Sequence, residues 1–187
     1  MPQDLITLVK STDIAKLMNP GTERLQSLQG FDPEYTDIVN YIVKCTHKIW
    51  EEQGVGLIYT HYPHNVKMHT GDGWYLGRDQ VVADTIQTMS AFPDRRPYAD
   101  AVVWAGDDQI GFYTNHMVYS LMHHTGHSVF GPPTGRKVMR FGMALCFVKA
   151  NLICEEWLLM DDIGVIRQLG LDLDATVALF ARRGAAR

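Results

Sequence analysis

The sequence contains little of what marks a secreted, membrane-spanning or disulfide-stabilised protein. Its three cysteines, Cys45, Cys146 and Cys154, are an odd number without the paired spacing of a zinc site. No apolar stretch reaches the roughly 18 residues that a membrane span requires. The N-terminus lacks the charged start and continuous apolar segment of a secretory signal. We therefore expect free thiols, a cytoplasmic location and no membrane partner.

Positive charge is also scarce. The net charge of the chain is −4, and the one basic cluster is Arg182-Arg183 with Arg187 at the C-terminus. Because nucleic-acid binding needs a basic patch or stripe, we expect no nucleic-acid partner. Hydrophobic residues make up 46% and charged residues 20% of the 187 residues, which is ordinary for a globular protein with a full core. A chain of this length is expected to form one domain.

The first half of the chain carries the periodicity of helices. Residues 1–30 contain the turn-forming segment Asn19-Pro20-Gly21 and are expected to form an N-terminal arm or extension, with a single domain over residues 31–187. Apolar residues between 38 and 49 recur at three- and four-residue steps, and Asp32 is the expected N-cap of that helix. A second amphipathic helix is predicted over residues 78–90.

The second half is typical of strands. Everything from Ala99 to Asp161 is rich in aromatic and β-branched residues, with hairpin turns expected at Asp107-Asp108 and Ala150-Asn151. A short helical tail is expected to follow. Helices first and a curved antiparallel sheet afterwards predict an α+β fold, with the sheet wrapped around the N-terminal helices.

Counting along the expected hairpins predicts which residues face each other. A two-residue turn at Ala150-Asn151 places Arg140 opposite Asp161 as an ion pair, and the other turn places Asp100 opposite Asn115, beside His116. Glu155 and Glu156 then point to opposite faces, so at most one of them lines the interior.

Both faces of the last strand are mostly apolar, whereas a sheet with one solvated face should alternate apolar and polar residues. We therefore predict a homodimer through the outer face of the sheet.

Two late segments carry a family resemblance. HTGHSVFGPPTGRKV resembles the "T-H-x-G … G-x-P-P-T-G-K/R-x-V" segment of SnoaL-like proteins, which are related to polyketide cyclases and belong to the nuclear-transport-factor-2-like superfamily. ICEEWLLMDDIGVIRQLG is similar to the segment that follows it in that family, and the resemblance covers about residues 32 to 172. It implies a cone-shaped fold of the cystatin-like or NTF2-like type, with an apolar cavity inside a curved sheet.

The resemblance also implies a range of functions. It suggests cofactor-independent acid–base chemistry of the isomerase, cyclase, dehydratase or hydrolase type on a small hydrophobic carbonyl- or hydroxyl-bearing molecule. His124 matches the family histidine, but the strand VMRFGMALCFVK holds no carboxylate where the cyclases have their acid/base aspartate. A non-catalytic small-molecule-binding or protein-interaction module of the same fold is therefore the alternative.

Histidine is the strongest acid–base candidate, because it titrates near neutral pH. We predict His124 and His69 as proton-transfer groups, with Asp100 or Asp161 orienting one of them. The predicted substrate-binding residues are aromatic or lie on the strands near these groups: Tyr59, Trp74, Trp104, His116, Met122 and Trp157.

Metal ligation and a structural role in the core are the alternatives to acid–base chemistry for these histidines. Neighbours on a strand point to opposite faces, so His123 and His124 cannot both face one ion, and we expect no metal and no cofactor. The Pro-Pro-Thr-Gly segment is interpreted as a strand connection within residues 128–138, since no helix follows it to bind phosphate. For each histidine, a hydrogen-bonded structural role remains the alternative.

Overall fold

The protein is built on one curved sheet that is covered by helices on one side. The structure is a computed structural model that describes residues 6–8, 14–19, 21, 23–71 and 73–184. The sheet has seven strands in the order β1-β4-β5-β6-β7-β2-β3 and does not close on itself. Its strands are β1 (Ile6–Leu8), β2 (Lys67–Thr70), β3 (Gly73–Leu76), β4 (Arg96–Asp107), β5 (Gly111–His123), β6 (Lys137–Lys149) and β7 (Leu152–Met160).

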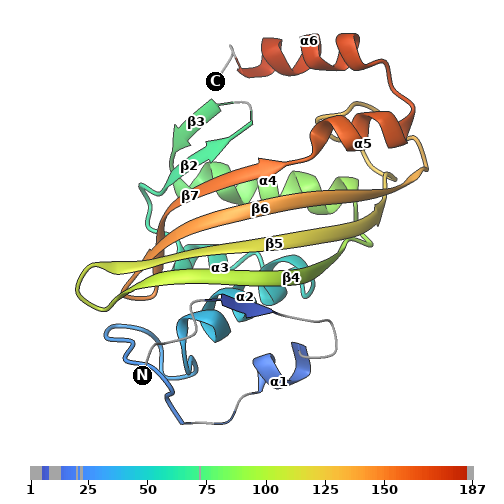
Figure 1. Cartoon of the computed structure of the whole chain (residues 1–187). Helices are drawn as coiled ribbons and strands as arrows, with labels where there is room; N and C mark the ends of the chain where they lie inside the picture. The colour runs from blue at the N-terminus through green and yellow to red at the C-terminus, as the bar shows by residue number, and fades with distance from the viewer. Residues whose placement is uncertain (1–5, 9–13, 20, 22, 72, 185–187) are drawn as a thin grey trace.

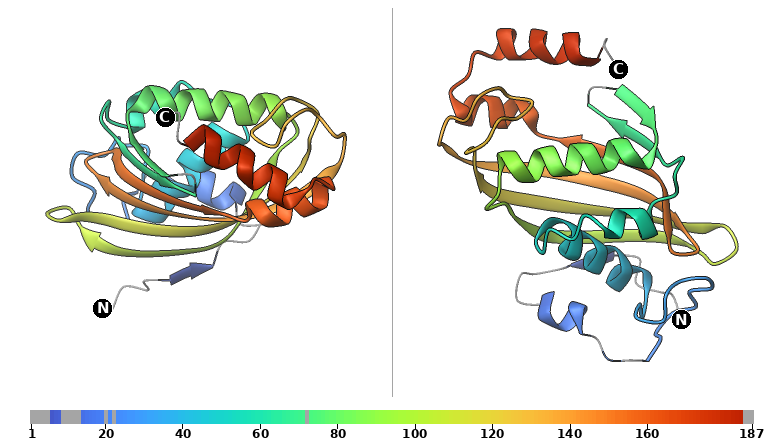
Figure 2. Two further views of the ribbon diagram at one scale, coloured as in Figure 1. Left: turned by 90° about the horizontal axis from the view of Figure 1, so that it is seen from above. Right: turned by 180° about the vertical axis from the view of Figure 1, so that it is seen from behind.

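The helices lie mainly on the concave side of this sheet. Seen from behind, α2 (Ile38–Trp50), α3 (Leu57–His61) and α4 (Arg78–Ala91) cross in front of the strands (Figure 2). The short α1 (Ile14–Met18) lies beside α2, whereas α5 (Asp162–Leu169) and α6 (Leu173–Gly184) follow β7 (Figure 1). The α+β fold predicted from the sequence is confirmed. The sheet is nevertheless mixed rather than wholly antiparallel, because β2 pairs in parallel with β7.

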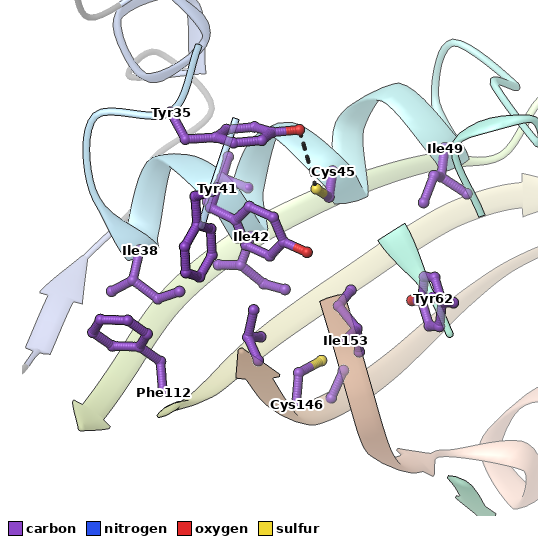
Figure 3. Packing of buried hydrophobic residues seen from close by; sticks show 14 of the residues in the cluster. Tyr35, Ile38, Tyr41, Ile42, Cys45, Ile49, Tyr62, Phe112, Cys146 and Ile153 are labelled. Atoms are coloured by element: carbon purple, nitrogen blue, oxygen red, sulfur yellow. Dashed lines mark hydrogen bonds between the residues drawn. The ribbon is translucent and has the colours of Figure 1, made fainter. Parts of the chain in front are cut away.

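The helix α2 supplies much of the core. Its apolar face packs against the inner sides of β4 to β7, where Tyr41, Ile42 and Cys45 meet Phe112 and Ile153 (Figure 3). Each fully buried large apolar side chain contributes about 1.5–3 kcal/mol.

The start of α2 differs from the prediction. Its N-cap is Asp37, whose side chain accepts a hydrogen bond from the backbone N–H of Asn40 at 2.7 Å. The helix therefore begins at Ile38 and not directly after Asp32, because residues 33–37 form a turn, in which Tyr35 N–H donates to the Asp32 carbonyl.

The hairpin between β6 and β7 has the predicted turn but a different register. Ala150 and Asn151 both have positive φ, as a two-residue turn of this kind requires, and Lys149 pairs with Leu152. A β-bulge then leaves Cys154 as an extra residue on β7, so that Phe147 pairs with Glu155.

From the bulge onward every predicted pair is wrong by one residue. Cys146 lies opposite Glu156 instead of Glu155, and Leu145 instead of Ala144 lies opposite Trp157. A pattern of alternating side chains cannot reveal an inserted residue, since both faces of β7 are mostly apolar.

The hairpin between β4 and β5 also turns later than predicted. Asp107 pairs with Gly111, and its side chain accepts hydrogen bonds from the backbone N–H groups of Gln109 and Ile110 at 2.8 and 3.0 Å. This Asx-type turn is longer than the two residues assumed from the sequence. Asn115 therefore faces Val103 rather than Asp100.

The connection between β5 and β6 agrees with the sequence interpretation. Residues 124–136 form a loop whose base is closed by two backbone hydrogen bonds. The His124 N–H donates to the Arg136 carbonyl, and the Gly135 N–H donates to the His124 carbonyl. The loop approaches α4 so closely that a Cβ on Gly126 would lie 2.2 Å from the Ser90 carbonyl oxygen. A glycine at position 126 is therefore required by packing.

The convex face of the sheet has large exposed apolar side chains. The outward-facing members on β4 to β7 are Tyr98, Val103, Tyr113, Tyr119, Met139 and Leu159. Figure 1 looks onto this face, which α2 to α4 leave uncovered. No helix among the described residues is both long and apolar enough to traverse a bilayer.

Candidate functional site

Three of the predicted site residues lie on the concave face. Trp104 on β4, His116 on β5 and Met122 on β5 point toward the helices and are at least nine-tenths buried. Met122 packs in a separate apolar cluster with Phe92 and Val138, near α5. Only Trp104 and His116 therefore face the main core beneath α2.

Other predicted residues lie on the opposite face or on the rim. His69 is on the convex side, where its Nε2 lies 2.8 Å from a Glu155 carboxylate oxygen and its ring stacks on Trp157 with 5.0 Å between the centroids. Tyr59 is half exposed beneath the Arg78 guanidinium, and Trp74 on β3 is 69% exposed. These residues do not meet His116 or Trp104.

Two hollows lie outside the concave interior. One, of about 280 Å³, is on the convex face and includes His69, Asn115, Leu145 and Trp157 in its lining. The other, of about 830 Å³, lies between α1, α2 and the start of β4. The larger hollow contains none of the residues predicted for catalysis or substrate binding.

His124 is fully buried at the base of the loop between β5 and β6. Its Nε2 lies 2.8 Å from the Ser128 hydroxyl, its Nδ1 accepts from the Thr134 backbone N–H at 3.3 Å, and its ring stacks on Phe92. Burial and the neighbouring His127 lower the pKa of His124. The side chain thus ties the loop to the end of α4, and its predicted catalytic role remains a prediction.

The two predicted orienting aspartates are at the surface. Asp100 is exposed at a bulge in β4, where it has no pairing partner on β5. Asp161 does not pair with Arg140, as the sequence register predicted. It caps α5 by accepting the Gly164 backbone N–H at 2.8 Å, while Arg140 forms its ion pair with Asp162. The one-residue shift after the bulge explains this correction.

The concave face holds a buried carboxylate instead. Glu156 on β7 is 8% exposed and points toward α3, where the Tyr62 hydroxyl donates a hydrogen bond to its Oε2 at 3.0 Å. Among the described residues, Tyr62 is the one hydrogen-bond partner of this carboxyl group. Burial raises the pKa of Glu156 to about 7, and the hydrogen bond from Tyr62 offsets only part of that effect.

The surroundings of Glu156 are apolar and include a thiol. Across the sheet its neighbours are Met68 on β2 and Cys146 on β6, and Thr114 on β5 lies beyond Cys146. Burial, followed by the nearby Glu156, raises the pKa of Cys146 well above its ordinary value. Figure 3 shows Cys146 and Tyr62 on the same side of the sheet below α2. The thiol is therefore protonated at neutral pH and is unsuited to nucleophilic chemistry.

His116 is the second polar group on this face. It lies on β5 opposite Val102 and Ala144, and burial lowers its pKa to about 4. Its Nδ1 is buried and has no hydrogen-bond partner in the part of the chain that the structure describes. A buried polar atom without a partner costs about 1–3 kcal/mol, so this nitrogen is a candidate contact for a ligand.

The histidines do not form a metal site. Over residues 6–8, 14–19, 21, 23–71 and 73–184, no three histidine, cysteine or carboxylate side chains come together as metal ligands. His61 is instead bound to the Tyr35 hydroxyl at 2.7 Å, in the interior, and His123 pairs with Asp94 at the surface.

Solved structures share this architecture. The fold matches TsrD from Streptomyces laurentii with a TM-score of 0.61 and 17% identity, covering 71% of this chain and 94% of that one. A SnoaL-like polyketide cyclase from Agrobacterium tumefaciens matches with a TM-score of 0.58 and 17% identity over 71% and 97% of the chains. IdmH from Streptomyces antibioticus matches with a TM-score of 0.59 and 17% identity over 71% and 98%.

No protein-family model and no curated protein sequence matches the chain. The structural likeness, at low identity, establishes the fold: the chain has the SnoaL-like, NTF2-like architecture that its two late motifs indicated.

The contact between Glu156 and Tyr62 was not predicted from the sequence. The strand pattern indicated that at most one of Glu155 and Glu156 faces inward, but the bulge at Cys154 decides which one. The sequence carries no signal for Tyr62, because this residue reaches the carboxyl group from the end of α3, far away in sequence. Contacts of this kind depend on tertiary packing.

Proposed function

We propose that the chain is an acid–base enzyme of the SnoaL-like type in which Glu156 transfers the proton. Its substrate would be a hydrophobic molecule with a carbonyl or hydroxyl group, and the reaction would be of the cyclase or isomerase type. The observation that carries the proposal is a buried carboxyl group bound to Tyr62 on the concave face. A group with a pKa of about 7 is populated in both protonation states near neutral pH, as a general acid and base requires.

The neighbouring groups would divide the remaining tasks. Tyr62 is neutral, since burial and then the nearby Glu156 raise its pKa well above its ordinary range, and its hydroxyl orients the carboxyl group. His116 is neutral as well and offers its unpartnered Nδ1 to a substrate oxygen. His116 and Glu156 lie two strands apart and are offset by two residues along the strands, a separation of about 12 Å, so a bound molecule of two or more rings would reach both.

Proton transfer by Glu156 can be measured without knowledge of the natural substrate. 1-Tetralone is a flat, hydrophobic ketone whose hydrogens next to the carbonyl exchange slowly with D₂O, and mass spectrometry follows their replacement. We expect the protein to accelerate this exchange, with a rate that rises as pH passes through about 7 and the carboxylate form accumulates.

The control variant changes the neighbouring carboxylate, Glu155. Glu156→Gln should lower the exchange rate by about 100-fold or more, whereas Glu155→Gln, on the convex face, should leave it unchanged. Equal exchange by the Glu156→Gln variant and the parent would contradict the role of Glu156. Exchange at the uncatalysed rate with the parent protein would favour the non-catalytic binding module.

We also propose that a second copy of the chain covers the convex face as a homodimer. The outward side chains there include Leu159 at 66% and Tyr113 at 48% exposure, and large exposed apolar patches on a protein often mark an interface. Sedimentation analysis should give a dimer for the parent and a monomer for Leu159→Glu. Ile86→Glu, which adds the same charge at an exposed position on α4, should remain dimeric. A parent protein that sediments as a monomer at micromolar concentration would contradict the proposal.

A further inference from the structure

A second polar group on the concave side lies far from Glu156. Arg95, in the connection between α4 and β4, points inward and donates from its Nε to the Ser120 hydroxyl at 3.1 Å. Its guanidinium lies over the Trp50 ring, 4.4 Å from the centroid. Ser120 is only 2% exposed, and Arg95 itself keeps part of its surface accessible. Trp50 and Ser120 thus fix the orientation of the guanidinium group.

Arg95 has no acidic partner in the part of the chain that the structure describes. Its Nε bond to Ser120 is the one hydrogen bond of its side chain there, so both terminal nitrogens have donors available. The adjacent carboxylate, Asp94, is used by His123, whose backbone N–H and Nδ1 lie 2.8 and 2.6 Å from its two oxygens. Withdrawing an arginine side chain from water without a neighbouring anion costs folding free energy, and a ligand that supplies the anion would offset this cost.

A second arginine increases the local positive charge. Arg140 on β6 lies directly opposite Ser120, and its ion pair with Asp162 leaves its Nε buried and without a hydrogen-bond partner. Burial, together with the like charge of Arg140, lowers the pKa of Arg95 to about 9. Of these two guanidinium groups, only that of Arg140 has a carboxylate partner among the described residues, in a chain whose net charge is −4. This excess positive charge is local to the site.

We infer that Arg95, Ser120 and Arg140 bind the carboxylate of an elongated apolar acid. The planar guanidinium of Arg95 matches a carboxylate in a bidentate arrangement. Arg140, at the strand position opposite Ser120, adds a second guanidinium group, whose buried Nε has no hydrogen-bond partner among the described residues. Along β5, His116 lies four residues from Ser120, about 13 Å away, on the same face. The apolar body of the acid would run along that face toward His116.

This inference deepens the proposed function by naming the substrate class, and it relies on that function only for the claim that the bound acid reacts. Binding itself is independent of Glu156. The test uses isothermal titration calorimetry with 2-naphthylacetate and its methyl ester, which have the same ring system but differ in charge.

We expect the parent to bind the acid about 10- to 100-fold more tightly than the ester. Arg95→Gln should remove that preference by weakening acid binding alone. Arg167→Gln, an exposed arginine on α5, should retain it. Glu156→Gln should also bind the acid as the parent does while it loses proton exchange, which separates the two proposals.

Equal affinity of the parent for acid and ester, or no binding of the acid at millimolar concentration, would overturn the inference. So would an Arg95→Gln variant that folds and keeps the full preference. If Arg95→Gln does not fold, the comparison of acid and ester on the parent protein decides alone.

Discussion

The two faces of the sheet give adjacent carboxylates of one strand opposite surroundings. On the convex face, Glu155 lies beside His69 and Lys67, partly exposed to solvent. On the concave face, Glu156 is buried and accepts a hydrogen bond from Tyr62. The residue type is the same and the positions differ by one. The environment, not the side chain, therefore makes Glu156 a candidate for proton transfer.

Histidines follow the same division. The Nε2 of His69, on the convex face, lies within hydrogen-bond distance of the Glu155 carboxylate. The Nδ1 of His116, on the concave face, is buried and has no hydrogen-bond partner among the described residues. Most polar groups inside a protein have a hydrogen-bond partner, so a buried polar atom without one marks a candidate contact for a ligand. The comparison favours the concave face as the site of chemistry and the convex face as a site of assembly.

The largest expected effect concerns the ionisation of Glu156. Its pKa is about 7 in the folded protein and near 4.5 when unfolded, so the folded state binds more protons between these values. The free energy of unfolding should therefore fall as pH rises from about 4.5 through 7. Glu156→Gln should remove this loss and become relatively more stable by on the order of 3 kcal/mol at pH 8.

Urea unfolding at several pH values measures this difference. Tyr62→Phe provides the control, because it keeps the carboxyl group buried and should keep the pH dependence. Parallel stability curves for Glu156→Gln and the parent would show that the carboxyl group titrates normally and would remove the contrast between the faces.

His116 should give the opposite sign. Its pKa is about 4 in the folded protein, below the ordinary 6.5, so the unfolded state binds more protons in this window. Stability should be lost as pH falls from about 6.5 through 4, and His116→Phe should gain about 2 kcal/mol relative to the parent near pH 4.5. The same urea series tests it. A relative stability of His116→Phe that does not change with pH would contradict the buried, neutral state.

His124 tests whether the loop between β5 and β6 depends on a structural histidine. His124→Ala removes contacts to Ser128 and Thr134 and a stacked ring, and should lower the free energy of unfolding by about 2 kcal/mol. His127→Ala, exposed in the same loop, should change it little. If His124→Ala unfolds like the parent but loses tetralone exchange, the catalytic role predicted for His124 is favoured.

The smallest effect is expected on the convex face. His69→Ala breaks a partly exposed ion pair with Glu155 and should cost about 0.5 kcal/mol or less of pairing energy. The measurement is best made in the Leu159→Glu background, so that assembly does not contribute. A loss of several kcal/mol there would show that the two faces differ less than we infer.

The sequence predicted the elements better than the site. Helix periodicity placed α4 within a residue of its bounds, and the turn at Ala150-Asn151 was right, because both features follow from local residue chemistry. The register beyond Cys154 was not predictable, since a bulge interrupts alternation without changing composition. The Tyr62–Glu156 contact joins segments 94 residues apart and depends on how α3 packs against β7.

The bulge at Cys154 also has a consequence for how this protein can change over generations. Deletion of that one codon would leave the other pairs as they are, with Glu155 opposite Phe147 and Glu156 opposite Cys146. Regular pairing through Cys154 would instead place Glu155 opposite Cys146 and turn Glu156 to the convex face. In relatives of this chain, the presence or absence of the bulge would therefore decide which of the two carboxylates is buried.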